Sequence, residues 1–419
     1  MRRWLAAGTL VGACLLAWLI ASRAAVPNPT LATVAVGMYP SAIAVDSGAG
    51  RALVLNLYDT TVSVIDEITA RVVATTTVGS NGGAHPQDLA LDTRLGHAFV
   101  TTDDGEVSML DSRSGRVLHV TRAGSGVGAI AICERTGRAF IADLDAGSVA
   151  VIDAATGTLL RTVSVGASPV TIVCDAPARR VFVADQGDGT VAVLDARSGR
   201  PLRSLLVGDA PVALAISDRY RGLLVAGAHG SLVGLDIETG ALRFRRAPFG
   251  QRLSAIDLRV AADDPAGYAL AGWGTRLLRI DPRTGATRGA IRLPSPLAAL
   301  GVDPSTGYPI AAVRGPIDAR GDPFGDGSLV RIGPGGGIVD AVTVAIDPSA
   351  FAVDSARHRL FVVNTNLNPD GSVPHPRPPP GTLLTTLGAW LRGWIPGIPP
   401  ATFPPGRSGS VTVLRLADL

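Results

Sequence analysis

Lysine is absent from this sequence, so all 38 of its basic residues are arginine. Without lysine the chain has no side-chain amine that could act as a nucleophile or form a Schiff base. The arginines recur singly at turn positions such as Arg51, Arg138 and Arg180, and they do not gather into runs. Because nucleic-acid-binding surfaces concentrate basic residues in a patch or stripe, nucleic acid is not a predicted partner.

Glutamate and cysteine are almost as scarce, with four Glu and three Cys in 419 residues. The glutamates are predicted to fall in turns rather than on strands. The sequence also lacks the G-x-S-x-G elbow of hydrolases and the C-x-x-C-H haem attachment motif. We therefore assign no catalytic residue, no metal ligand and no cofactor, and an enzyme is the less favoured interpretation.

Charged residues make up only 17% of the chain, against 47% hydrophobic residues, 50 Gly and 30 Pro. This mixture is typical of many short buried strands joined by tight turns, and it argues against disorder and against long helices. The composition therefore predicts an all-β protein.

The N-terminal residues 1–25 have the pattern of an export segment. Arg2 and Arg3 precede an apolar run of 17 residues from Trp4 to Ile20, a length at the lower edge of what spans a bilayer and above a usual signal h-region. An uncleaved anchor, a signal peptide cleaved near Ser22 and a lipoprotein modified at Cys14 all remain open. Each exports the rest of the chain, so we expect a periplasmic, cell-surface or secreted protein.

Only Cys133 and Cys174 lie in the exported part, at offset positions of successive sequence repeats. A disulfide needs Cα atoms within about 7 Å, which neighbouring repeats need not provide. We expect these two residues to be small buried hydrophobic side chains without a disulfide.

Internal repeats dominate the rest of the chain. Segments such as Arg51–Asp66, Arg138–Asp153 and Arg180–Asp195 share one pattern, and their closing aspartates recur every 41 to 45 residues. These closing residues are Asp66, Asp111, Asp153, Asp195, Asp236 and Asp281. A period of this length with several strands in each unit is typical of a β-propeller.

Each repeat is predicted to contain four strands. After five of the closing aspartates, the turn before the fourth strand has the pattern D-x-x-[ST]-G, as in Asp111–Gly115 and Asp153–Gly157. The Asp side chain can accept hydrogen bonds from the backbone of such a turn, and Gly adopts positive φ without a steric cost. Two less regular repeats follow the six regular ones, so the sequence predicts eight four-stranded blades, with seven as the alternative.

The last repeat lacks its fourth strand, and the segment Thr30–Gly37 resembles the missing piece. We therefore expect the N-terminal strand to pair with the C-terminal blade and to close residues 30–419 into one ring, which removes exposed sheet edges. The ring is expected to be monomeric.

The repeats resemble the YVTN-type β-propeller family of bacteria and archaea. The matching tetrapeptides are Leu53–Asn56, Phe140–Asp143, Phe182–Asp185 and Phe361–Asn364. The resemblance implies an extracytoplasmic propeller and leaves the activity open, because one fold serves many functions.

Residues that break the repeat near the channel mouth are the candidate ligand contacts. They lie in the loop before a first strand or in the hairpin between second and third strands, where propeller ligands gather. The candidates are His85, Gln87, His229, Arg252, Trp273 and Arg314. Together they could hold an anionic or sugar-like ligand through charge-assisted hydrogen bonds and stacking, or they could be unrelated surface residues.

A Pro-rich insertion at 365–408 interrupts the last blade. Within it, apolar residues follow the spacing of one helix face, ended by Pro396. The candidate contact residues on this face are Leu387, Trp390, Leu391, Trp394 and Ile395. The helix could cover the propeller itself, dock a partner or lie on a membrane surface.

Two functions are compatible with these features. The first is a non-catalytic binding or scaffold propeller of the cell envelope, with a protein or small molecule as its ligand. The alternative is a periplasmic propeller enzyme or electron-transfer component, similar to lactonases or to quinoprotein dehydrogenase heavy chains. A convergent set of acidic or His side chains on the inner strands would favour the second.

Overall fold

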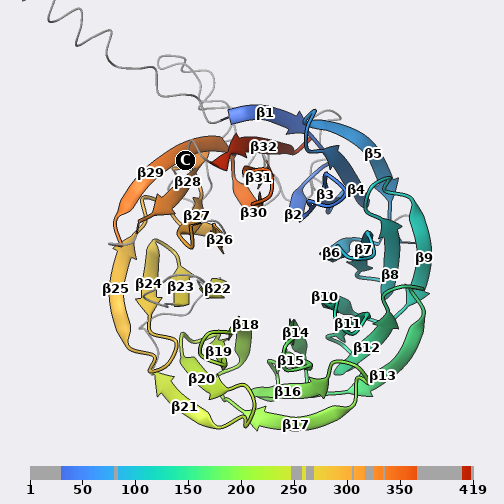
Figure 1. Cartoon of the computed structure of the whole chain (residues 1–419), viewed down its shortest axis with the longest axis vertical. Coiled ribbons are helices and arrows are strands. Elements are labelled where there is room, and N and C mark those ends of the chain that lie inside the picture. The colour runs from blue at the N-terminus through green and yellow to red at the C-terminus, as the bar shows by residue number, and fades with distance from the viewer. Residues whose placement is uncertain are drawn as a thin grey trace, which may run out of the picture.

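The computed structural model describes residues 30–79, 84–246, 257–260, 269–303, 306–316, 325–333, 336–365 and 408–416, with the backbone alone for 257–260 and 269–273. These residues form eight four-stranded antiparallel sheets arranged around a ring (Figure 1). We call each sheet a blade and number the blades in chain order. The chain is therefore an eight-bladed β-propeller, and the seven-bladed alternative is excluded.

The first four blades are regular. Blade 1 contains β2 (Pro40–Asp46), β3 (Arg51–Asn56), β4 (Thr61–Asp66) and β5 (Arg71–Thr77). Blade 2 contains β6 (Pro86–Asp92), β7 (His97–Thr102), β8 (Glu106–Asp111) and β9 (Val117–Arg122). Blade 3 contains β10 (Val127–Cys133), β11 (Arg138–Asp143), β12 (Ser148–Asp153) and β13 (Leu159–Ser164). Blade 4 contains β14 (Pro169–Asp175), β15 (Arg180–Asp185), β16 (Thr190–Asp195) and β17 (Pro201–Leu206).

The other four blades complete the ring. Blade 5 contains β18 (Pro211–Ser217), β19 (Gly222–Gly227), β20 (Leu232–Asp236) and β21 (Leu242–Arg246). Blade 6 contains β22 (Asp257–Val260), β23 (Ala269–Trp273), β24 (Arg276–Ile280) and β25 (Thr287–Arg292). Blade 7 contains β26 (Leu297–Val302), β27 (Pro309–Val313), β28 (Asp326–Ile332) and β29 (Ile338–Ile346). Blade 8 contains β30 (Pro348–Asp354), β31 (Arg359–Asn364), β32 (Ser410–Arg415) and β1 (Thr30–Ala35).

Burial follows the position of each strand in its blade. The first strand of each blade lies nearest the axis and the fourth forms the rim, with β30 innermost and β1 outermost in blade 8 (Figure 1). The middle strands are buried almost throughout, as in β3 and β11, because neighbouring blades cover both of their faces. Four second strands each contribute a fully buried phenylalanine at the same position: Phe99, Phe140, Phe182 and Phe361. Each such ring contributes roughly 1.5–3 kcal/mol through burial.

The alternation of strand direction gives the ring two distinct faces. Loops that lead from one blade to the next, and hairpins between second and third strands, lie on one face, which we call the loop face. Turns between first and second strands, and between third and fourth strands, lie on the opposite face, which we call the turn face. No helix within the described ranges is long and apolar enough to cross a membrane. The apolar run Trp4–Ile20 lies outside those ranges.

The turns after the third strands have the predicted chemistry. In the first turn with the predicted pattern, Asp111 Oδ1 accepts hydrogen bonds from the Ser114 hydroxyl at 2.6 Å and from the Ser114 backbone N–H at 2.8 Å, and these bonds help to hold the pKa of Asp111 below its usual value. In the same turn, Gly115 has φ +73°, and a Cβ there would lie 2.8 Å from Val64 Cγ2. Glycine is therefore required both by its backbone conformation and by the close approach of blade 1.

The ends of the chain close the ring as predicted. Strand β1 pairs antiparallel with β32, with Thr33 opposite Thr412 and Val34 opposite Val411. Beyond the strand, the Val36 N–H donates to the Gly409 carbonyl at 3.0 Å. One buried apolar cluster contains both Val34 of β1 and Val413 of β32, and it continues into blade 1. The closure therefore joins blade 8 to blade 1 through both backbone pairing and core packing.

The expectation for the cysteines is wrong, because Cys133 and Cys174 form a disulfide. The innermost strands of a propeller converge toward its axis, and β10 and β14 place the two Cα atoms 5.7 Å apart. That spacing is within the range that a disulfide requires. The bond joins blade 3 to blade 4 across 41 residues of sequence.

Removal of this disulfide should destabilise the ring. A double variant with Cys133→Ala and Cys174→Ala is expected to lose about 2–4 kcal/mol of unfolding free energy, since the cross-link no longer restricts the unfolded chain. Urea unfolding of the variant and of the oxidised protein measures the loss, and the reduced wild-type protein should behave like the variant. Equal midpoints for all three proteins would contradict the prediction.

A pair of carboxyl groups, Glu67 and Asp354, lies on the turn face where blade 8 packs against blade 1. Glu67 is fully buried in the turn after β4, and Arg357 Nη1 donates to its Oε2 at 3.2 Å and to Asp354 Oδ2 at 3.3 Å. Burial, the hydrogen bond to Asp354 and the charge of Asp354 raise the pKa of Glu67 to about 8, although the positive charges of Arg357 and Arg359 act to lower it. Burial would raise the pKa of Asp354 as well, but hydrogen bonds from Glu67 and Ser47 lower it. The raised pKa of Glu67 and the lowered pKa of Asp354 together favour a protonated Glu67 beside an ionised Asp354.

This pair should make the stability of the ring depend on pH. The folded-state pKa of Glu67 lies above its ordinary value of 4.5. The contribution of Glu67 to the free energy of unfolding is therefore complete below pH 4.5 and is lost as the pH rises through about 8. Glu67→Gln keeps a neutral hydrogen-bonding side chain, so the variant should match the wild type near pH 5. It should be more stable at pH 9, by on the order of 1–3 kcal/mol. Denaturant unfolding between pH 5 and 9 tests this, and identical profiles for the two proteins would refute it.

Candidate binding site at the channel mouth

The loop face carries a repeated backbone contact around the channel. In each described case, the residue directly before an innermost strand accepts a hydrogen bond from the first residue after the same blade's second strand. Leu57 N donates to Tyr39 O at 3.0 Å, and Thr365 N donates to Asp347 O at 3.1 Å. We call the accepting residue the mouth position. The repeated contact brings the blade-connecting loop and the hairpin of each blade together.

The side chains at the mouth position differ sharply around the ring. Three consecutive blades carry large or charged residues: Asp347 in blade 8, Tyr39 in blade 1 and His85 in blade 2. In the remaining described blades the position is held by Gly126, Ser168, Ala210 and Pro296. The backbone contact is the same in both groups, so the fold does not require the larger side chains. One arc of the mouth is therefore chemically distinct.

An aromatic group forms the first half of this arc. The rings of Tyr39 and Tyr58 have centroids 4.9 Å apart, and Tyr58 meets the ring of His85 edge-on at 6.3 Å. His85 Nδ1 lies 3.1 Å from the Leu57 carbonyl oxygen, which holds the ring in place. The side chain of Tyr58 is 41% exposed, so an aromatic surface faces solvent at the boundary of blades 1 and 2.

An ion pair between a buried carboxylate and a partly exposed guanidinium forms the second half of the arc. Asp347 is 4% exposed, accepts a hydrogen bond from Thr365 Oγ1 at 2.8 Å and lies 3.3 Å from Arg314 Nε. Burial raises the pKa of Asp347, while Thr365 and Arg314 oppose that rise. The pKa of Tyr39 is raised by burial and by the charge of Asp347, so its phenol stays protonated at neutral pH. Tyr39, Tyr58, His85, Arg314 and Asp347 together are called the mouth cluster below.

The structure places the candidates from the sequence in different parts of the ring. His85 and Arg314 belong to the mouth cluster, and Gln87 lies beside it, with Nε2 donating to the His85 carbonyl at 3.2 Å. His229 is in the hairpin of blade 5, hydrogen-bonded to Asp209, and blade 5 lies across the ring from blades 8 and 1 (Figure 1). Of the four candidates whose side chains are described, His229 therefore lies apart from His85, Gln87 and Arg314.

The other candidates lie outside what the structure describes. Trp273 ends β23, but its side chain is not among the described parts, and Arg252 falls outside the described residues. The same holds for the insertion residues Leu387, Trp390, Leu391, Trp394 and Ile395.

Sequence reasoning missed Tyr39, Tyr58 and Asp347. The repeat-breaking residues that the sequence singled out were His, Gln, Arg and Trp. Aspartate recurs in most turns of the repeat, so Asp347 did not stand out. An alignment of the residue before each innermost strand would have revealed Tyr39 and Asp347, since the same position holds Gly126, Ser168 and Ala210 elsewhere.

One further carboxylate breaks the repeat on an innermost strand. Asp88 of β6 occupies the position of Ala42 in β2 and Ala213 in β18. Its Oδ2 accepts a hydrogen bond from Ile130 N of blade 3 at 3.1 Å, and burial raises its pKa. Both carboxylate oxygens accept backbone N–H groups, so Asp88 ties two blades together. Among the described residues, no three His, Cys, Asp or Glu side chains gather as metal ligands could.

Comparison with known proteins supports the fold class. The sequence pattern of the family described as outer membrane protein assembly factor BamB matches residues 145–299, and no curated protein matches the chain. The solved structure of BamB from Moraxella catarrhalis is similar, with a TM-score of 0.59 at 17% identity over 80% of this chain and 97% of that one.

Two further solved structures are similar at comparable levels. The dihydro-heme d1 dehydrogenase NirN in complex with DHE has a TM-score of 0.61 at 16% identity, over 81% of this chain and 72% of that one. The computationally designed Ika8 protein has a TM-score of 0.61 at 17% identity, over 81% of this chain and 97% of that one. At such identities the likeness establishes the propeller fold alone.

The ion pair between Asp347 and Arg314 should contribute to stability. Asp347→Ala leaves the Thr365 hydroxyl and the Arg314 guanidinium without their carboxylate, and we expect a loss of about 1–3 kcal/mol. Asp347→Asn should lose less, because Asn can still accept from Thr365 and tolerates the positive φ of 52° at this position. Thermal and urea unfolding of both variants measure the difference. Equal losses for the two variants would show that the carboxyl oxygens do not matter.

Proposed function

We propose that this chain is an extracytoplasmic, non-catalytic propeller that serves as a binding or scaffold module of the cell envelope. In this proposal, residues 1–25 export the chain or anchor it in the membrane, and residues 30–419 form a monomeric YVTN-type ring that uses no cofactor. The mouth cluster is the surface that contacts a protein or small-molecule ligand of the envelope. The insertion at 365–408 begins beside this cluster and adds a second contact surface.

The mouth cluster is the observation that carries the proposal. Binding surfaces favour aromatic residues and arginine, because these side chains supply a large contact area together with hydrogen-bonding groups. Here Tyr58 and Arg314 lie on a single arc, and both side chains are partly exposed. Blade 4 has Gly187 at the position of Tyr58 and Gln186 at the position of Arg314, so the blade fold requires neither residue there.

Two independent features support a location outside the cytoplasm. The Cys133–Cys174 bond is of a kind that forms and persists in oxidising compartments. The match of residues 145–299 to an outer membrane protein assembly factor favours the envelope by analogy with that family.

Site-specific photo-crosslinking tests the proposal on the full-length chain in intact cells. A photoreactive phenylalanine in place of Tyr58 should give covalent adducts with an envelope component, because this side chain faces the ligand. The same probe in place of Tyr220, on the turn face, is the matched control and should give none. In a pull-down of the same partner by protein without the probe, Tyr58→Ala should reduce recovery by about tenfold, as for a hot-spot aromatic residue.

Different results would contradict different parts of the proposal. Adducts at both positions, or at neither, would contradict a binding role for the mouth cluster. Deletion of residues 381–405 in the folded protein tests the insertion, since unchanged adducts would remove it from the contact surface. Stoichiometric calcium, zinc or a bound chromophore in the purified protein would instead favour the enzyme or electron-transfer alternative.

A further inference from the structure

The turns of the turn face carry many exposed arginines. They occur singly in the sequence, but the fold brings them to one face, because turns between first and second strands and between third and fourth strands all lie there. Only two exposed carboxylates, Asp218 and Glu238, lie in the same described turns. The exposed arginines of these turns belong to blades 2 to 6 and are Arg94, Arg113, Arg116, Arg135, Arg179, Arg197, Arg200, Arg219 and Arg283.

The carboxylates of this face are mostly directed inward. Asp46, Asp92, Asp175 and Asp354 end innermost strands and are buried. Asp46 Oδ1 accepts the Ala49 N–H at 2.9 Å, as a cap of the turn that follows. The Asp residues that hold the turns therefore lie beneath the surface, while the arginine side chains of the same turns extend into solvent.

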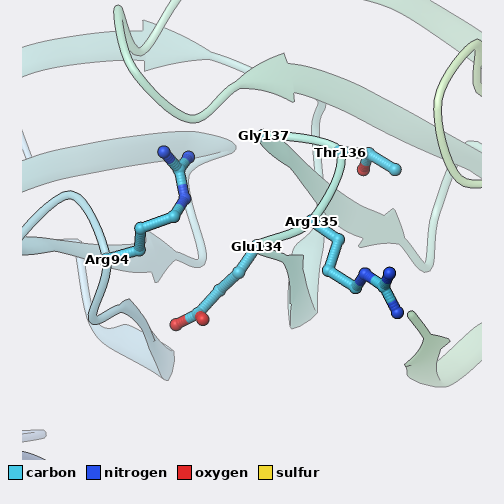
Figure 2. A pocket seen from close by; sticks show the side chains of 5 residues that line it. All are labelled: Arg94, Glu134, Arg135, Thr136 and Gly137. Atoms are coloured by element: carbon cyan, nitrogen blue, oxygen red, sulfur yellow. The ribbon is translucent and has the colours of Figure 1, made fainter. Parts of the chain in front are cut away.

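The arginines are spread over the face and do not converge on one point. Figure 2 shows two of them, with the side chains of Arg94 and Arg135 extending in different directions from turns of blades 2 and 3 that line an open hollow. The side chain of Arg94 is 55% exposed although it lies 3.8 Å from Asp92. A compact ligand could contact few of these guanidinium groups at once, whereas a flat anionic surface could contact many of them.

The hairpins of the loop face carry the opposite charge. Arg314 is the arginine of the described loops and hairpins, and it already pairs with Asp347. Arg122 and Arg292 are exposed where outermost strands end at this face, so its charge is mixed. Exposed carboxylates lie in four successive hairpins, at Asp59, Asp103, Asp145 and Asp188. An anionic surface is therefore attracted to the turn face more than to the loop face.

The chain also enters the ring on the turn face. Thr30, the first residue of β1, pairs with Leu414, which pairs in turn with Leu360, the second residue after the turn between β30 and β31. The ten peptide steps from Ile20, the end of the apolar run, to Thr30 span at most about 35 Å. An anchor formed by that run would therefore hold the turn face toward the bilayer.

The point of entry and the exposed arginines lie in different parts of the ring. The chain enters at blade 8, whereas the arginines belong to blades 2 to 6, which extend around the other side of the ring (Figure 1). A tether alone would leave the ring free to tilt. Contact through the arginines as well would hold the turn face parallel to the bilayer.

We propose that the turn face lies against a bilayer that contains anionic phospholipids, with the exposed arginines contacting lipid phosphates and the mouth cluster facing away from the membrane. Guanidinium pairs with phosphate through two parallel hydrogen bonds, and each arginine near a negatively charged membrane surface adds to the attraction. This orientation deepens the proposed function and rests on its export segment for the tether. Because lipid occupies the turn face, the photoreactive probe at Tyr220 should still capture no protein.

Energy transfer from the ring to the bilayer tests the orientation. The full-length chain with Cys14→Ser is placed in nanodiscs of phosphatidylcholine, with or without phosphatidylglycerol, that contain acceptor-labelled lipid. A donor dye is attached through Ala155→Cys, in an exposed turn of blade 3, or through Ala146→Cys, in the exposed hairpin of the same blade. In anionic discs, transfer from residue 155 should be at least about twofold stronger than from residue 146, and this ratio should fall without phosphatidylglycerol.

Two variants with equal loss of charge separate the turn face from general attraction. The turn-face variant should lower the transfer ratio in anionic discs toward the value in phosphatidylcholine, because it removes three exposed guanidinium groups. It combines Arg113→Gln, Arg135→Gln and Arg197→Gln. The matched variant should leave the ratio unchanged, because its arginines end outermost strands at the loop face. It combines Arg122→Gln, Arg246→Gln and Arg292→Gln.

Retention of the chain by the discs distinguishes the surface from the anchor. Retention by anionic discs alone, with residue 155 nearer the lipid, would support the surface and remove the anchor from the proposed function. The orientation is wrong if neither kind of disc retains the chain, or if residue 146 gives transfer as strong as residue 155. It is also wrong if the ratio is the same in both lipids, or if both variants lower it equally. None of these failures bears on ligand capture at the mouth cluster.

Discussion

The pairing of β1 with β32 is the contact on which the ring depends, because it joins residues 30–35 to residues 410–415. Every other blade is built from strands that are local in sequence, so its pairing closes only short loops. The β1–β32 pairing closes a loop that contains nearly the whole chain, so it has the largest cost in loop-closure entropy. Core packing from Val34 and Val413 into blade 1 offsets that cost.

The seam made by this pairing carries the most unusual chemistry of the described residues. On the turn face, Arg357 of blade 8 donates to both Glu67 of blade 1 and Asp354 of blade 8. On the loop face, Tyr39 follows β1 and Asp347 precedes β30. The candidate binding site therefore exists only when the ring is closed. A ligand that contacts both sides of the seam would stabilise the closed form, since it binds the folded state alone.

Several features could be predicted from the sequence because they are local and repeated. The blade count, the Asp-capped turns and the closing strand each follow from patterns within about 45 residues. The disulfide could not be predicted in this way, because the 5.7 Å between the Cα atoms of Cys133 and Cys174 depends on how closely two blades approach at the axis. The candidate site was predicted in part. His85 and Arg314 were found as breaks in the repeat, whereas Tyr39 and Asp347 needed the alignment of mouth positions around the ring, and Tyr58 needed the structure, which places its ring beside Tyr39.

The amino-acid sequence alone determined the architecture: eight units, four strands in each, and the strand that closes them. Strand periodicity and turn chemistry are properties of neighbouring residues, so they can be recognised in the sequence alone. Only the tertiary structure decided which side chains meet. Arg314 and Tyr39 are separated by 275 positions in the chain, yet the charge of Arg314 acts on the Tyr39 phenol. Ring closure brings blades 7, 8 and 1 together, and no local sequence pattern indicates that their side chains come close to one another.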